Sequence, residues 1–422
     1  MTEPIFNYPT DWDIYDLMPS PKDEIIMDVS SGSTPSTANL DYWGGNTPWL
    51  TPKVITKRNT HRYKSNSKQF LTNEGTKKAG RVYPINTVML TKRAPVGFAV
   101  INKIPMTTNQ GFQNIICNDG YDNLFVLYLL QHNKYRLIRL AQGTTFLEIN
   151  KKNVGKVELS FPNKKQEQQK IASILSNVDA QIQQTQKLID LTQRLKKGLM
   201  QNLLTRGIGH TKFKTVQLMP RWNKTETPDN WNVVKLSDVG KIITGSTPST
   251  TNLEFYGSDY VWATPEDIEN IKFVNDSKTK LTKKGFDEGR EIPEKSILFV
   301  CIASIGKIAM AGTKMATNQQ INSIVCEGYN PDFIYYQLLF HSKKIKNISN
   351  IVAVPIINKN DFGKYQITVP SDKKEQQKIV SILSNVDEQI NQHKNEKALL
   401  ERIKKGLMQQ LLTGQRRVKV GV

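Results

Sequence analysis

The side chains in this sequence that could do chemistry are mainly cations and amides, not nucleophiles or metal ligands. Residues 51–82 hold nine basic side chains against a single acid, Glu74, with Tyr63 and Phe70 among them. Such side chains displace counterions from phosphates and supply affinity that does not depend on base sequence. The stretch predicts contact with a polyanion, the alternative being a flexible, solvated loop. The corresponding residues 266–290 carry six basic and six acidic side chains.

The balance of the whole chain points the same way. Its 422 residues include 58 Lys plus Arg against 38 Asp plus Glu, a formal charge of +20. An excess of this size favours a nucleic-acid partner, although a protein can also be basic without one. The length predicts two or three domains, and the 38% hydrophobic content is enough to build their cores.

Several enzymatic chemistries lack their residues. There is no Pro-Pro, so the Asn/Asp-Pro-Pro-aromatic motif of an amino-methyltransferase is missing. Gly240–Thr247 imitates a phosphate-binding loop, but Ser246 stands where the lysine is needed, which favours a turn after a strand. The five histidines do not cluster, and the three cysteines form no Cys-x-x-Cys pair. We therefore expect no catalytic residue, metal site or cofactor in this chain.

Compartment signals are sparse. The first 21 residues are acidic and interrupted by prolines, unlike a signal peptide, and no apolar run approaches 18 residues. Few, unpaired cysteines suit a reducing compartment. These features predict a cytoplasmic protein without a membrane span.

The strongest signal is an internal repeat. Residues 167–204 align without gaps with residues 375–412, and 25 of the 38 positions are identical. Upstream pieces recur in the same order: Gly32–Thr37 and Gly245–Thr250 both read Gly-Ser-Thr-Pro-Ser-Thr, and Thr-Asn-Gln occurs at 108–110 and 317–319. The chain therefore alternates domain, helix, domain, helix. We predict globular domains at 1–161 and 230–369, helices at 162–207 and 370–415, a linker at 208–229 and a basic tail at 416–422.

The two repeated segments predict long helices. Apolar residues recur at steps of three and four from Ile171 to Leu203 and from Ile379 to Leu411, including Leu191, Leu195, Leu399 and Ile403. This pattern is typical of a coiled-coil seam, and each helix would be a rod of roughly 60 Å. We expect the two to pair antiparallel. Outer positions that are alike in both copies predict a subunit interface at Gln168, Gln169, Lys196, Lys197, Gln376, Gln377, Lys404 and Lys405, the alternative being a solvated face.

The regions before each helix alternate short apolar runs with turn signals, which predicts α+β domains. Strands are expected at Val88–Leu90 and Ile297–Ile302, and helices at Phe125–Leu130 and Phe333–Leu339. The copies differ in polar loops: Thr91–Ala94 aligns with Val300–Ala303. Arg to guanine and Asn or Gln to adenine are favoured base pairings. Candidate DNA contacts are Lys53, Lys57, Arg58, Arg62, Lys64, Lys92, Arg93, Asn109 and Gln110, and in the second domain Lys278, Lys280, Lys283, Lys284, Ser304, Asn318, Gln319 and Gln320. Plain drift between the copies would give the same divergence.

The helix motifs Glu-Gln-Gln-Lys-Ile and Lys-Lys-Gly-Leu-Met-Gln, each after a domain with Gly-Ser-Thr-Pro, resemble the specificity subunit of type I restriction–modification enzymes. The resemblance covers essentially the whole chain. It implies two α/β target-recognition domains, each reading one half of a bipartite, asymmetric double-stranded DNA site. It implies that the helices set the spacer and dock two methyltransferase subunits, to which restriction subunits are added. S-adenosylmethionine, ATP and Mg²⁺ would belong to those partners. A rod of roughly 60 Å corresponds to about 17 base pairs at 3.4 Å each.

Two other functions fit parts of the pattern. A coiled-coil adaptor whose charge is incidental would show no tight, sequence-selective DNA complex. A self-sufficient methyltransferase would bind the methyl donor by itself. The recognised bases and the spacer length cannot be deduced from the sequence.

Overall fold

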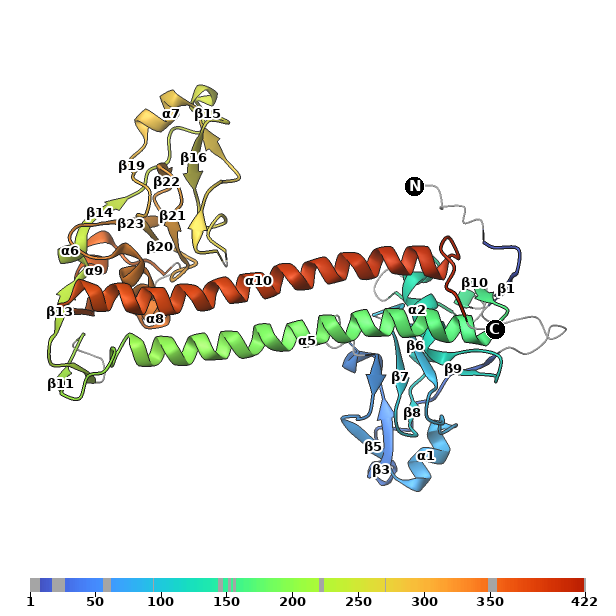
Figure 1. Cartoon of the computed structure of the whole chain (residues 1–422). Coiled ribbons are helices and arrows are strands. Elements are labelled where there is room, and N and C mark those ends of the chain that lie inside the picture. The colour runs from blue at the N-terminus through green and yellow to red at the C-terminus, as the bar shows by residue number, and fades with distance from the viewer. Residues whose placement is uncertain are drawn as a thin grey trace. The chain divides into compact units, whose positions relative to one another are not determined.

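The computed structural model describes residues 8–16, 27–55, 62–93, 95–142, 147–150, 153–154, 157–219, 224–269, 271–347 and 355–420. It forms two compact units: residues 1–186 with 395–422 make unit 1, and residues 187–394 make unit 2. Each unit contains a globular domain and one part of each long helix, α5 (Lys165–Leu203) and α10 (Lys373–Leu412). These helices, green and red in Figure 1, confirm the two predicted long helices.

The described residues of the unit 1 domain form three sheets. β1 (Trp12–Asp16) pairs antiparallel with β10 (Glu158–Pro162). A five-stranded sheet has the order β2 (Met27–Ser30), β9 (Phe112–Cys117), β6 (Val88–Thr91), β7 (Ala99–Asn102) and β4 (Tyr63–Lys64). A smaller sheet has the order β5 (Gln69–Leu71), β3 (Trp43–Leu50) and β8 (Thr107–Thr108). Short helices are η1 (Leu40–Tyr42), η2 (Pro52–Val54), α1 (Asn73–Ala79), α2 (Asn123–His132) and α3 (Lys134–Arg139).

The domain of unit 2 repeats this plan. β13 (Trp231–Lys235) pairs with β24 (Gln366–Pro370). One five-stranded sheet has the order β14 (Gly240–Thr244), β23 (Ile321–Cys326), β20 (Ile297–Val300), β21 (Ile308–Ala311) and β17 (Phe273–Val274). The other has the order β15 (Tyr256–Gly257), β18 (Lys280–Leu281), β16 (Tyr260–Ala263), β22 (Met315–Thr317) and β19 (Glu291–Ile292). The helices are α6 (Leu236–Val239), η3 (Leu253–Phe255), α7 (Lys283–Glu288), α8 (Pro331–Lys346) and α9 (Lys359–Gly363).

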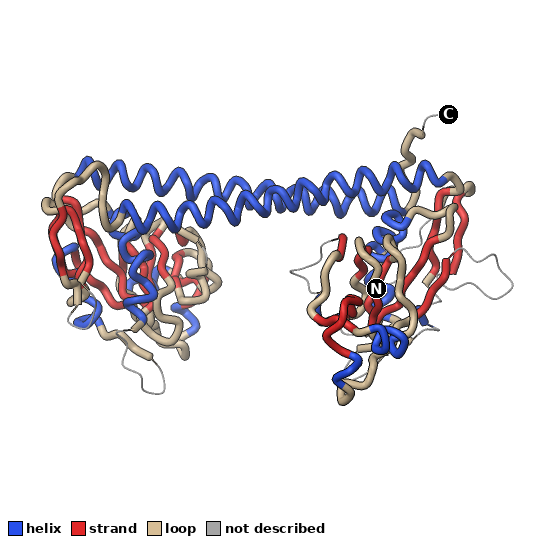
Figure 2. Tube along the Cα trace, turned by 90° about the horizontal axis from the view of Figure 1, so that it is seen from below, coloured by secondary structure: helices blue, strands red, loops and turns tan. Residues whose placement is uncertain are grey.

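Each domain is layered, and the strand period of two explains how. Along β6, Val88 and Leu90 pack with α2 and the long helices, whereas Met89 packs on the opposite face of the sheet. In β20, Ile297 and Phe299 face α8, and Leu298 and Val300 face the other sheet. Figure 2 shows the sheets in red and the helices in blue. The two strands and two helices predicted in the domains are thus present, but β20 ends at Val300 instead of the predicted Ile302, and α8 is longer than expected.

The long helices pair antiparallel within each unit, as predicted. In unit 1, Lys404 contacts Asp179 at 2.8 Å, and Lys397 donates to Gln186 at 2.7 Å. In unit 2, Lys196 contacts Asp387 at 2.5 Å. As the residue number rises along α5 it falls along α10, and the two numbers of every pair add to the same total. Both units therefore have one register.

The predicted seam is wrong in one part. Leu191 and Leu195 are 58% and 53% exposed in unit 2, and Leu399 and Ile403 are 54% and 43% exposed in unit 1. Ile189, which lay outside the predicted stripe, is buried. A stripe with a period of 3.5 drifts by about 20° per heptad around a straight helix of 3.6 residues per turn. These residues consequently leave the contact face.

The chain that follows each long helix contacts the first turn of the other long helix. In unit 2 the predicted linker contains an antiparallel ribbon, β11 (Phe213–Val216) with β12 (Thr225–Pro228), and His210 contacts the Glu375 carboxylate at 2.8 Å. In unit 1 the Arg417 guanidinium donates to Asp11 and to the buried Glu167. The predicted basic tail thus includes a residue that packs against its own unit.

Candidate nucleic-acid interface

The repeated motifs meet in space in each domain. In unit 1, a Cβ at Gly32 would lie 1.8 Å from the Thr108 carbonyl oxygen, so only glycine lets the two loops approach so closely. The Trp49 indole donates to the Ser33 carbonyl at 3.1 Å, and the Thr34 hydroxyl donates to Gln110 Oε1 at 2.6 Å. The Gly-Ser-Thr-Pro and Thr-Asn-Gln motifs therefore form one loop module.

Unit 2 builds the same module. A Cβ at Gly245 would lie 2.1 Å from the Asn318 carbonyl oxygen. The Trp262 indole donates to the Ser246 carbonyl at 3.0 Å, and the Thr247 hydroxyl donates to Gln319 Oε1. The Trp and Thr–Gln hydrogen bonds that both modules share explain why these short motifs recur at two places in the chain.

Beside the module, unit 1 holds a polar cluster that we call the 31/92/113 cluster. Lys92 Nζ donates to Ser31 Oγ at 3.1 Å, and Ser31 Oγ donates to Gln113 Oε1 at 3.2 Å. Lys92 is half-buried and Gln113 is fully buried. Gln113 Nε2 has no hydrogen-bond partner among the residues that the structure describes. The cluster places the Lys92 cation beside two neutral polar groups, Ser31 and Gln113.

The equivalent cluster of unit 2 has different chemistry. Thr244 Oγ1 donates to Asn322 Oδ1 at 2.7 Å, and Asn322 Nδ2 donates to Cys301 Sγ at 3.2 Å. Burial raises the pKa of the Cys301 thiol to about 12, so the group stays neutral. The lysine of one domain is thus replaced by a buried thiol in the other. Among the candidates, Lys92 belongs to such a cluster, but sequence comparison did not single out Ser31 or Thr244.

The other candidates of these loops have structural contacts. Asn109 and Asn318 each accept a backbone N–H two residues on, from Gly111 and Gln320. Arg93 contacts Glu148 at 2.9 Å, and both side chains are less than half exposed. Ser304 is exposed in the loop after β20. A hollow of about 470 Å³ in unit 2 is lined by three of the candidates, Lys278, Asn318 and Gln320, together with neighbouring groups.

The candidate lysines of unit 2 are all paired with carboxylates of the same domain: Lys278 with Glu266, Lys280 with Asp276, Lys283 with Asp287 and Lys284 with Glu254. Ion pairs at a surface contribute only about 0–1 kcal/mol, so a phosphate could replace the carboxylate at small cost. Their DNA contact therefore stays a prediction, but they add little net positive charge.

In unit 1, the basic stretch divides. Lys53 is exposed and Lys64 is half-buried, whereas Lys57 and Arg58 lie outside the described residues. The prediction for Arg62 needs correction, because its side chain is 11% exposed and donates to Tyr128 at 3.3 Å and to Ser176. Arg62 faces α5, since Asp179 on that helix offers a carboxylate 3.7 Å away.

Arg62 belongs to a network that recurs in both units. Asp179 accepts from the Tyr128 hydroxyl at 2.7 Å and contacts Lys404 at 2.8 Å. In unit 2, Asp387 accepts from Tyr336 at 2.8 Å and contacts Lys196 at 2.5 Å. Burial, and then the neighbouring aspartate, raises the pKa of both tyrosines, which keeps them protonated. The network joins one domain helix to both long helices.

The predicted subunit interface is therefore corrected in part. Lys196 and Lys404 lie between the paired helices. Gln168 and Gln376 are buried, and each donates to the carbonyl of the proline before its helix, at 3.0 Å. These four residues position the helices. Their neighbours remain exposed candidates: Gln169, Gln377, Lys197 and Lys405.

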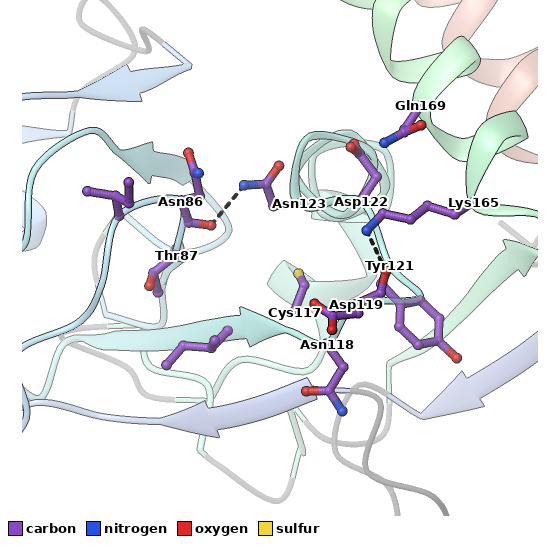
Figure 3. A pocket seen from close by; sticks show the side chains of 12 residues that line it. Asn86, Thr87, Cys117, Asn118, Asp119, Tyr121, Asp122, Asn123, Lys165 and Gln169 are labelled. Carbon is purple, nitrogen blue, oxygen red and sulfur yellow. Dashed lines mark hydrogen bonds between the residues drawn. The ribbon is translucent and has the colours of Figure 1, made fainter.

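A polar hollow of about 240 Å³ lies where α5 leaves the domain of unit 1 (Figure 3). Asn123 donates to the Asn86 carbonyl at 3.0 Å, and Lys165 donates to the Asp119 carbonyl. Cys117 also lines it, and burial raises the pKa of this thiol to about 12. These contacts hold the joint between domain and helix, and the thiol is not in its nucleophilic form.

The residues that the structure describes contain no group of three or more His, Cys, Asp or Glu side chains placed to hold a metal ion. No helix among them is long and apolar enough to cross a membrane.

The chain has two domains of the same fold with different polar clusters, and a pair of long helices connects them. This arrangement defines a class of recognition proteins with two binding domains. Comparison with known proteins makes this specific. The family described as type I restriction modification DNA specificity domain matches residues 24–193 and 228–402. The chain belongs to this family.

Individual relatives agree. The type I restriction enzyme MjaIX specificity subunit of Methanocaldococcus jannaschii is 30% identical over 97% of this chain and 95% of its own length. The HindI specificity subunit of Haemophilus influenzae is 35% identical over 44% of this chain and 42% of its own length. The crystal structure of a type I restriction–modification S subunit from M. genitalium has the same fold, with a TM-score of 0.60, 14% identity and 98% coverage of both chains.

Proposed function

We propose that this chain is the DNA-recognition subunit of a type I restriction–modification complex. Each globular domain reads one half of a bipartite, asymmetric site in double-stranded DNA. The long helices set the spacer between the halves and dock two methyltransferase subunits. The chain itself carries no catalytic group, and methyl transfer, ATP-driven translocation and cleavage belong to its partners.

One observation supports this proposal above the others. The two domains share a loop frame down to single hydrogen bonds, Thr34 with Gln110 and Thr247 with Gln319. Beside that frame, the cluster changes from Ser, Lys and Gln to Thr, Cys and Asn. A common frame with different polar groups is what two readers of different bases require. Each good pairing with a base edge discriminates by about 1–3 kcal/mol.

The electrostatics divide the work between the domains. Unit 1 presents exposed lysines such as Lys53, whereas the four candidate lysines of unit 2 are paired with carboxylates. Phosphate contacts position a protein on DNA without specifying sequence. We therefore assign most of the salt-dependent affinity to unit 1. In unit 2, neutral amides and hydroxyls would carry more of the recognition.

The partners would supply the cofactors. S-adenosylmethionine would bind the methyltransferase subunits, while ATP and Mg²⁺ would serve the restriction subunits. In this proposal the specificity chain takes no part in the chemical steps. It reads the bases and holds two enzymes at a set distance from them.

The test is to assemble the chain with the methyltransferase subunit of the same system and map methylated adenines in genomic DNA. The expected result is methylation at one bipartite sequence with a constant spacer. Exchanging the cluster residues of unit 1 for those of unit 2, as Ser31→Thr, Lys92→Cys and Gln113→Asn, should alter one half of that sequence and leave the other intact. Methylation without a fixed sequence would contradict the proposal.

A coiled-coil adaptor with incidental charge is the alternative. Binding of a defined DNA site that weakens steeply between 50 and 200 mM salt would exclude it. Binding of S-adenosylmethionine by the isolated chain would instead favour a self-sufficient methyltransferase.

A further inference from the structure

Each domain has one leucine that projects into solvent. Leu40 in unit 1 and Leu253 in unit 2 are both 79% exposed, the highest value for a large apolar side chain among the described residues. The residues around them are alike, since 39–43 and 252–256 both read Asn-Leu-acid-aromatic-aromatic. A single exposed leucine needs no explanation, but the same leucine with the same exposure in both domains indicates a shared contact.

In unit 1 a short hydrogen-bonded turn fixes the position of the leucine. Leu40 begins η1, and the Asn39 side chain accepts the Asp41 N–H at 3.0 Å. The Thr72 hydroxyl donates to the Asp41 carbonyl at 2.6 Å. Thr72 is also the N-cap of α1, so this helix supports the turn from below.

Unit 2 repeats each of these contacts. Leu253 begins η3, and the Asn252 side chain accepts the Glu254 N–H at 3.1 Å. The Thr282 hydroxyl donates to the Glu254 carbonyl at 2.6 Å, and Thr282 is the N-cap of α7. The backbone under both leucines is therefore preorganised, which lowers the entropy lost when they bind a partner.

The turns lie next to the loop modules. The Gly-Ser-Thr-Pro-Ser-Thr motif of each module ends three residues before the leucine, a reach of at most about 11 Å. Each turn is also bonded back to that motif. The Trp43 indole donates to the Ser36 carbonyl at 3.1 Å, and the Tyr256 hydroxyl donates to the Pro248 carbonyl at 2.8 Å. A duplex that is read by the module is thus within reach of the leucine.

Basic side chains lie on the helices that support the turns. Lys78 is exposed on α1. On α7, the exposed Lys283 and Lys284 pair with Asp287 and Glu254, and the second pair directly follows the leucine in the turn. Surface pairs of this kind open at small cost, so phosphates can replace the carboxylates. An apolar side chain with cations nearby suits the interior of a base stack, which phosphates border on both sides.

We propose that Leu40 and Leu253 are wedges, each of which inserts between two neighbouring base pairs of one half-site and bends the duplex there. This inference rests on the proposed function. Apolar wedges, leucine among them, partly unstack a base step and kink DNA by about 20–90°. A wedge needs no particular base edge, which explains why the leucine is the same in two domains whose polar clusters differ. Because pyrimidine–purine steps unstack most easily, the wedge also selects sequence without a hydrogen bond.

Place and charge favour DNA over a methyltransferase subunit as the contact of these leucines. Figure 1 shows α1 and α7, which support the turns, at the ends of the domains that are farthest from α5 and α10 respectively. The proposed function assigns the methyltransferase subunits to those long helices. The formal charge of +20 and the lysines beside the turns favour a polyanion.

The experiment uses the full chain assembled with the methyltransferase subunit of the same system, and duplexes that carry the site found by methylation mapping. The adenine analogue 2-aminopurine, whose fluorescence rises when it loses its stacked neighbours, replaces each adenine within and beside the half-sites in turn. The wild-type complex should give a several-fold rise at one step in each half. Leu40→Ala should remove the rise in one half only, and Leu253→Ala in the other half only.

Affinity gives a second readout that a phosphate contact would not mimic. Leu40→Ala and Leu253→Ala should each raise Kd by about tenfold, because apolar area is no longer buried. The slope of log Kd against log salt concentration should stay unchanged, because no counterion release is lost. Leu40→Met should restore most of the affinity. Ile14→Ala and Val233→Ala, which truncate exposed apolar side chains at equivalent positions of β1 and β13, are the controls and should change neither readout.

The outcomes separate the two proposals. If the complex methylates no fixed sequence, the proposed function fails, and this inference fails with it. If it methylates a fixed bipartite sequence but no position gains fluorescence, or the leucine variants keep the gain, only the inference is overturned. It is also overturned if the variants bind the methyltransferase subunit more weakly without DNA, since the leucines would then be a protein contact. If uracil in place of thymine abolishes the same affinity, the leucines read thymine methyl groups, and the wedge is again refuted.

Discussion

Replacing Asp179 by asparagine should destabilise unit 1 more than the same change at Asp387 destabilises unit 2. Asp179 is 13% exposed and faces two cations, Lys404 at 2.8 Å and Arg62 at 3.7 Å. Asp179→Asn leaves both cations without an anion in a partly buried site, although the Tyr128 hydroxyl can still donate to the amide oxygen. In unit 2 the cation that corresponds to Arg62 is Lys272, which donates to the Tyr336 hydroxyl at 3.4 Å and has an anionic partner of its own, Asp332 at 2.6 Å.

The magnitudes follow from burial. Breaking a buried ion pair from one side costs about 3–5 kcal/mol. Because the groups around Asp179 keep 11–22% of their exposure, we expect about 2–3 kcal/mol for Asp179→Asn. We expect about 1–2 kcal/mol for Asp387→Asn, which leaves only Lys196 without its anion. For units of this size, each 1 kcal/mol lowers the Tm by about 2–4 °C.

Urea unfolding of the full chain would measure the free energies, and hydrogen exchange would assign each loss to a unit. Glu388→Gln, beside Asp387 but exposed, is the control and should change stability by less than about 0.5 kcal/mol. Lys404→Met should recover part of the loss caused by Asp179→Asn, because it removes one of the two unpaired cations. Equal effects at Asp179 and the control, or a larger loss at Asp387, would refute the reasoning.

Three further predictions concern recognition, spacing and pH. Lys92→Ala should weaken binding to one half-site by about tenfold and Arg93→Ala by less, since Arg93 is already paired with Glu148; equal weakening of both halves in competition assays would make them phosphate contacts instead. Four residues added to α5 between Gln183 and Lys187 should lengthen the methylated spacer only when α10 receives a matching insertion near Lys394, because each helix contributes to both units. An unchanged spacer in the variant with both insertions would rule out the ruler role. Burial lowers the pKa of His341 to about 3, so the unfolded chain takes up a proton below about pH 6.5 that the folded chain excludes, and stability falls as the pH drops from there towards 3. Unfolding at pH 7 and pH 5 should show about 2 kcal/mol more loss in the wild type than in His341→Gln.

Much of the fold could be predicted because the relevant signals are local. The repeat, the long helices and the strands at Val88–Leu90 and Ile297–Ile302 depend on periodicity and identity along the chain. The antiparallel pairing followed from two long apolar stripes that no small domain could bury. Prediction failed in choosing which face of the helix makes the contact. Leu191 and Ile189 are two residues apart, and only the packed structure shows that Ile189 is the buried one.

The candidate site was less predictable. Arg62 and Lys53 are both cations of the same basic stretch. The structure buries the first against Asp179, more than a hundred residues away, and leaves the second exposed. Similarly, Lys196 and Lys197 are neighbours with opposite roles, one inside the helix pair and one outside it. Charge can be read from a chain, but the partner of a charge depends on contacts made at long range.

The sequence alone determined the duplicated plan and the family resemblance, because both depend on residue identity at matched positions. Tertiary structure decided which equivalent positions share a role. It brought Ser31, Lys92 and Gln113 together from three separate segments, and Thr244, Cys301 and Asn322 likewise. It also turned Leu191 and Leu399 outward. The physical reason is that a helix or strand has a face only relative to what packs against it, and here the packing partners lie far along the chain.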